Sequence, residues 1–159
     1  MPGEIEILLR VLDQAYDKKS WHGSTLRGAL RRITPKEAVW RPSPERHNIQ
    51  ELVVHAAYWK YRAARSIRGE GGRGSFPLKG SDWFERPGDA DPDLWEQDLR
   101  LLDEMHAALR EAVAAIDPKK LGRKAPRSEW TYQQLATGAA AHDLYHTGQM
   151  QLLRRLQRE

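Results

Sequence analysis

Two histidines near the end of the sequence have the spacing of a chelating pair. His142 and His146 are four residues apart in a segment predicted to be helical, so their side chains leave one helix face about a turn apart. A third imidazole from another helix would complete a facial set of metal ligands. His55, within the apolar seam of a second predicted helix, is the candidate for this role. These three residues predict a site for one divalent metal ion.

Each histidine also has an ordinary structural interpretation. A lone histidine on an apolar helix seam is more often a hydrogen-bonded core residue, and a pair four residues apart is often exposed or structural. Three buried imidazoles close together are costly unless an electrophile satisfies them, which favours the metal site. Because the sequence contains no cysteine, thiolate ligands, disulfides and a cysteine nucleophile are excluded. Any sulfur chemistry must therefore use a thiol supplied by the substrate.

Two polar residues beside the pair have open roles. Asp143 takes the position of the general base in the HExxH pattern of zinc proteases. However, aspartate is one methylene shorter than glutamate, and it lies about 100° around the helix from His142, which favours pairing with an arginine of a neighbouring helix or of a dimer partner. Gln149 is either a hydrogen-bonding partner of a ligand or a satisfied core amide.

The remaining histidines and the tryptophans are expected to be structural. Two roles remain open for His22: it lines the pocket, or it caps or packs against a helix. His47 precedes a helix cap. His106 flanks the apolar stripe of its helix, so it is expected at the surface or at an edge. Each of the six tryptophans is interpreted as a core anchor rather than a platform for a ligand.

Helices separated by loops account for the sequence, with no convincing strand. Apolar residues recur at three-to-four spacing in four long segments. These are Glu4 to Asp17, Asn48 to about Gly69, Asp91 to Ile116, and Thr131 to Leu156. Shorter helical stretches are predicted from Thr25 to Ile33, after a kink at Gly23, and from Thr34 to about Trp40. The pattern predicts an all-α four-helix bundle, a single domain over residues 1–159, with long loops at 70–89 and 121–130.

The composition limits the partners. The formal charge of +4 and the pI near 9.5 invite a nucleic-acid interpretation, but acids are mixed with the bases and no nucleic-acid-binding motif accompanies them. Solvated helix faces are the preferred explanation. No segment has the length and apolarity of a membrane span, and the first residues do not have the pattern of a signal peptide, so a soluble cytoplasmic protein is expected.

Four strings resemble, in order and spacing, the DinB-like family of bacterial four-helix-bundle proteins. They are YDKKSWHGSTLRGAL, RPSPERHNIQELVVHAAYW, SDWFERPGDADPDLW and TYQQLATGAAAHDLYHTGQMQLLRR. The resemblance implies a homodimer and a divalent metal, often nickel or zinc, on three histidines that match His55, His142 and His146. Relatives often open the second helix with serine, isoleucine and tryptophan, where this chain has Asn48, Ile49 and Gln50. Asparagine caps a helix as well as serine does, so only a local packing or pocket contact is in doubt.

Three classes of function remain open. Some proteins of this family are thiol transferases that use bacillithiol or mycothiol, one related branch is a mycothiol-dependent maleylpyruvate isomerase, and many have no known reaction. A metal-dependent transferase acting with a low-molecular-weight thiol is the preferred hypothesis, because a thiol is more acidic than water and needs less help from a base. The alternatives are a metal-dependent hydrolase with Asp143 as base and a non-catalytic metal-binding or stress-response protein. Whether the protein is an enzyme is left open.

Overall fold

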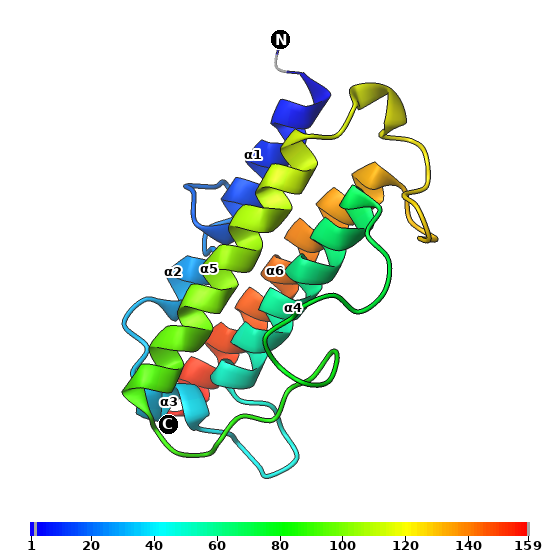
Figure 1. Ribbon diagram of the computed structural model, residues 1–159. Coiled ribbons are helices and arrows are strands. Elements are labelled where there is room, and N and C mark those ends of the chain that lie inside the picture. The colour runs from blue at the N-terminus through cyan, green and yellow to red at the C-terminus, as the bar shows by residue number, and fades with distance from the viewer. Residues whose placement is uncertain (2, 159) are drawn as a thin grey trace.

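The computed structural model describes Met1 and residues 3–158, which form helices and connecting loops (Figure 1). The helices are α1 (Glu4–Tyr16), α2 (Leu26–Leu30), α3 (Pro35–Val39), α4 (Ile49–Arg68), α5 (Pro92–Ala114), the 3-10 turn η1 (Pro118–Lys120) and α6 (Tyr132–Leu156). Within these residues there is no strand, only an isolated bridge between Lys124 and Thr131. The predicted all-α fold is confirmed.

The long helices α1, α4, α5 and α6 lie side by side, and α2 and α3 follow α1 toward the C-terminal end of α6 (Figure 1). The stretch expected to be helical up to Ile33 ends at Leu30, and Arg32 takes a positive φ of 63° that a helix does not allow. Nor is Gly23 a kink within a helix. It lies in the irregular connection between α1 and α2, with a φ of 99°.

Helix caps set the register of the two helices that carry the histidine triad. Asn48 and Glu51 form a capping box at the start of α4, and Thr131 and Gln134 form one at the start of α6. Both boxes are recognisable in the sequence. Because a cap fixes where a helix begins, it also fixes which face each later residue occupies.

The core has two apolar halves with a polar layer between them. One half surrounds the first part of α4 and the last part of α6, and the other surrounds α1 and the opposite ends of the same helices. Three buried polar side chains lie between the halves: Lys60 of α4, His106 of α5 and Asp143 of α6. Every residue from Ile49 to Tyr58 is buried, so this part of α4 is covered on all its faces.

Most tryptophans are not core anchors, contrary to the expectation from the sequence. Trp95 is buried, whereas Trp21 is fully exposed, and Trp59 and Trp130 are 42% and 59% exposed. A count of apolar residues does not reveal this, because burial depends on which segments pack over each side chain. None of the described helices combines the length and the apolarity needed to cross a bilayer.

Candidate metal centre

The structure brings the three predicted histidines together. His55 comes from α4, and His142 and His146 come from successive turns of α6. The Nε2 atom of His142 lies 3.2 Å from that of His55 and 3.0 Å from that of His146. His55 and His146 are buried and His142 is partly exposed, so the cluster is reached from one side.

Hydrogen bonds on the far side of two rings assign their protons. Nδ1 of His55 donates to the backbone carbonyl of Asp82 at 2.9 Å, and Nδ1 of His146 donates to Oε1 of Gln149 at 2.6 Å. In the neutral rings, both Nε2 atoms therefore carry lone pairs directed at the cluster. His142 has at most one Nε2 proton to offer, so it can satisfy only one of them.

A bound cation would remove this conflict. Two nitrogens that each lie about 2.0–2.1 Å from one ion are separated by roughly 2.9–3.4 Å for tetrahedral or octahedral angles. The two observed separations fall within that range. In the part of the chain that the structure describes, the cluster of His55, His142 and His146 is the group of potential ligands that lie close enough together to share an ion. The residues present fit a divalent metal.

Burial keeps the three imidazoles neutral. Loss of hydration lowers the pKa of His142 to about 3, with smaller contributions from the neighbouring His146 and His55. It lowers the pKa of His146 to about 4 and also lowers that of His55, although the Asp82 carbonyl partly opposes the shift at His55. Neutral imidazole is the form that binds metal, so the site needs no deprotonation near neutral pH.

The long loop between α4 and α5 covers one side of the cluster. Trp83 stacks on the ring of His55 at a centroid distance of 3.9 Å and on His47 at 3.6 Å, so its indole is held between two imidazoles. The carboxylate of Asp82 accepts a bond of 2.7 Å from Nε1 of Trp59. The predicted long loop thus supplies an acceptor for a candidate ligand and a ring that shields it.

A buried ion pair, rather than a catalytic base, accounts for Asp143. Its carboxylate accepts a 2.5 Å bond from Nζ of Lys60, and both side chains are almost fully buried. Pairing with a neighbouring helix was predicted correctly, but the partner is a lysine and not an arginine. Burial raises the pKa of Asp143, and the adjacent ammonium opposes that shift. Its other oxygen, Oδ1, has no hydrogen-bond partner.

The prediction for His106 was wrong. This residue is buried, stacks on Tyr16 at 3.6 Å between ring centroids, and lies with Nδ1 3.3 Å from Nζ of Lys60. His106 lies at the flank of the apolar stripe of α5 and faces Lys60 of α4. The spacing of residues within α5 could not reveal this contact. Burial and the nearby ammonium lower the pKa of His106 to about 3.

The other open assignments are now resolved. His22 is exposed beside Ser20 and does not join the cluster, while His47 has a packing role against Trp83. Gln149 is a hydrogen-bonding partner of a candidate ligand. Asp82, Trp83 and Lys60 were missed as neighbours of the site, because nothing in their spacing shows what they contact. The string SDWFERP was the available signal, since it carried part of the family resemblance.

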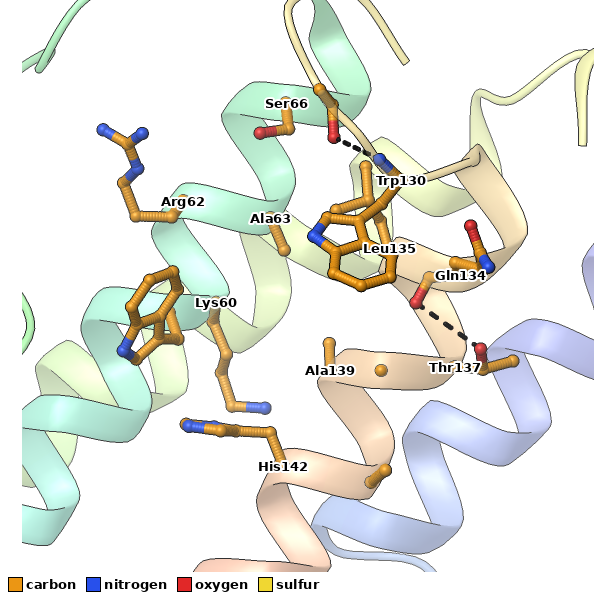
Figure 2. Close-up of a pocket in the computed structure, with 14 residues that line it drawn as sticks. Lys60, Arg62, Ala63, Ser66, Trp130, Gln134, Leu135, Thr137, Ala139 and His142 are labelled. Atoms are coloured by element: carbon orange, nitrogen blue, oxygen red, sulfur yellow. Dashed lines mark hydrogen bonds between the residues drawn. The ribbon is translucent and has the colours of Figure 1, made fainter. Parts of the chain in front are cut away.

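An apolar groove runs from the cluster between α4 and α6. It has a volume of about 610 Å³, and His142 and Trp59 line the end next to the candidate metal site. Figure 2 shows Lys60 beside His142 at that end and Trp130 over Leu135 at the other.

Comparison with known proteins gives a family match. The profile of a family described as the DinB superfamily matches residues 20–150, which is most of the chain and includes all three histidines. The search of curated proteins and the search of solved structures gave no match.

Proposed function

The chain belongs to the DinB superfamily, and from this membership together with the histidine cluster we propose that it binds one divalent metal ion through Nε2 of His55, His142 and His146. The observation that carries the proposal is that Nε2 of His55 and Nε2 of His146 each direct a lone pair toward Nε2 of His142. That atom carries at most one proton, so it can satisfy only one of them. Imidazole ligands suit zinc and nickel, and we propose one of these as the native ion.

Calorimetric titration of metal-free protein with zinc and nickel tests the site. Alanine at any one of the three histidines should weaken binding by more than about 100-fold, because loss of a residue that only hydrogen-bonds a metal ligand already costs about 10–100-fold. His22→Ala is the matched control, since this histidine is exposed and lies outside the cluster. Equal affinity in wild type and all three triad variants would refute the site.

We further propose that the protein is a transferase acting with a low-molecular-weight thiol. When bound, the ion would supply a positive charge that lowers the pKa of a thiol in an open coordination position. The carboxylates nearest the triad are engaged elsewhere: Asp143 pairs with Lys60, and Asp82 accepts from Trp59 on the Nδ1 side of His55. A reaction that needs little help from a base is therefore favoured over hydrolysis.

Cobalt substitution distinguishes the two reactions. A thiolate bound to cobalt gives a charge-transfer absorption, so adding bacillithiol, mycothiol or glutathione to the cobalt protein should produce this band. Asp143→Asn should leave the band in place, since Asp143 does not join the cluster. Absence of the band with all three thiols, together with a hydrolytic activity that Asp143→Asn abolishes, would move the assignment to the hydrolase. Absence of both would favour a non-catalytic metal-binding protein.

A further inference from the structure

The groove between α4 and α6 (the α4–α6 groove) is open because small residues line it. Ala139 of α6 faces Ala63 of α4 across it (Figure 2), and Gly138 of α6 also lines it. A Cβ atom added at Gly138 would meet no atom within 4 Å, so the space beside this helix is free. The volume of about 610 Å³ lies within the range of roughly 300–1,000 Å³ typical of small-molecule sites.

Two exposed indoles form the ends of the groove; a hydrogen bond fixes the ring of one of them, and backbone hydrogen bonds fix the loop that carries the other. Trp59 donates through Nε1 to the carboxylate of Asp82, the residue whose carbonyl also accepts from His55. Trp130 lies on a tight loop, where its amide donates to Ser128 Oγ at 3.1 Å and its carbonyl accepts from the Ala125 amide at 3.0 Å. Exposed aromatic rings offer a planar ligand a large contact area, and the bond to Asp82 fixes the ring of Trp59 before a ligand binds.

The charges of the lining select the ligand further. Apart from His142, the ionisable side chains that line the groove in the described part of the chain are Lys60 and Arg62. Because Lys60 is buried and paired with Asp143, Arg62 supplies the positive charge at the groove. Among the described residues, no carboxylate lines the groove to pair with a cationic ligand. An uncharged or anionic aromatic molecule fits this lining.

We propose that the α4–α6 groove binds the aromatic, apolar body of a small-molecule substrate and directs its reacting end toward the ion at His142. This inference rests on the proposed metal site, because His142 is shared by the groove and the triad. Trp59 links the two parts, since Asp82 positions its ring and also accepts from His55. The groove therefore indicates which class of molecule would react with the activated thiol: a small molecule with an aromatic, apolar body.

The first test uses metal-free protein, so that it does not depend on the metal. The probe 8-anilinonaphthalene-1-sulfonate should bind and gain fluorescence, and Gly138→Leu should weaken this by at least about tenfold because leucine fills the apolar space. Gly122→Leu is the matched control, because Gly122 is exposed, has free space for a Cβ and does not line the groove. Trp130→Ala, at an exposed position, should also weaken binding and provides a second variant should Gly138→Leu fail to fold.

The second test uses cobalt-loaded protein and compares imidazole with 4-phenylimidazole. Both should shift the cobalt spectrum, and the phenyl group should tighten binding by about tenfold or more in wild type and in Gly122→Leu but not in Gly138→Leu. If cobalt does not bind at the triad, the proposed metal function fails, and the metal-free test still decides the groove. Unchanged probe binding in both Gly138→Leu and Trp130→Ala overturns the inference. So does a change from dimer to monomer in Gly138→Leu, which would make the groove a subunit interface.

Discussion

Individual side chains around the triad act mainly by fixing protons and ring orientations. Gln149 shows this most directly, because its Oε1 accepts from Nδ1 of His146 and so leaves Nε2 free to bind. Asp82 does the same for His55 through a backbone carbonyl, which side-chain substitution does not remove. The two acceptors therefore differ in how they respond to mutation.

Replacing Gln149 should weaken metal binding without unfolding the protein. Gln149→Leu removes the acceptor on His146, and we expect a loss of about 10–100-fold in zinc affinity, measured by competition with a chelator. Gln149→Glu keeps an acceptor oxygen and should retain most of the affinity. Equal affinities in Gln149→Leu and wild type would show that the bond does not orient the ring.

His106 should make stability depend on pH. Its pKa is about 3 in the folded protein and near 6.5 when unfolded, so below pH 6.5 only the unfolded chain takes up this proton. Stability should therefore be lost as pH falls from about 6.5 toward 3, by up to about 1.4 kcal/mol per pH unit from this residue.

The measurement compares urea unfolding of wild type and His106→Gln between pH 7 and 4. The variant is expected to be less stable at pH 7 because it loses the stacking contact with Tyr16. Its free energy of unfolding should nevertheless fall less steeply with acid. Parallel curves for the two proteins would contradict the assignment.

At the scale of elements, the polar layer joins α4 to α5 and α6. Lys60 bonds Asp143 and approaches His106, and both contacts are buried. Breaking a buried ion pair leaves one charge uncompensated, whereas replacing both members with apolar residues removes that penalty. The layer thus constrains which helices pair and at what register.

A double-mutant cycle tests this constraint. Lys60→Met and Asp143→Leu should each cost about 3–5 kcal/mol of unfolding free energy, because each strands its partner's charge. The double variant should cost much less than their sum, measured by urea denaturation. Additive losses would mean that the two side chains contribute independently.

An arginine makes one of the contacts that fix the loop between α4 and α5 to the bundle. Arg86 donates to both oxygens of Asp98 on α5, at 3.0 and 2.7 Å, and the same carboxylate accepts from Gln50 of α4. This arrangement holds the segment that carries Asp82 and Trp83 against His55.

Arg86→Ala should therefore release the loop. We expect faster chymotrypsin cleavage at the aromatic residues of the loop and about tenfold weaker zinc binding, because the acceptor for His55 is no longer held. Arg73→Ala is the control, since Arg73 donates to Leu78 within the same loop. If both variants were cleaved at the same rate, the clamp at Asp98 would not be the cause.

For the whole molecule, we propose a two-fold homodimer formed through α6. Tyr145, Leu152 and Leu156 are 65%, 58% and 36% exposed and recur on one face of this helix. An exposed apolar stripe of this kind is a candidate contact surface, and small homo-oligomers most often have two-fold symmetry.

Light scattering tests the dimer. Leu152→Asp should halve the mass because it places a charge within the contact, whereas Ile7→Asp, at an exposed apolar position of α1, should not change it. A monomer mass for wild type at micromolar concentration would reject the proposal.

Local sequence patterns are enough to predict the helices and the candidate ligands. Caps such as Asn48 and Thr131 fix where helices start, and the apolar period fixes which face turns inward, because both are local effects of neighbouring residues. The four-residue spacing of His142 and His146 follows from the same helix geometry. The place of His55 on the apolar seam of another helix made it the candidate third ligand, and the resemblance in the motifs supported it.

What each of these helix faces contacts depends on how the helices and loops pack in the folded protein. Asp82 and Trp83 reach His55 from a loop whose path depends on the Arg86 contact with α5. His106 is buried because Lys60 and Tyr16 approach it from two other helices. Spacing along one helix sets the direction of a side chain, but the environment of that side chain depends on packing between segments far apart in the sequence.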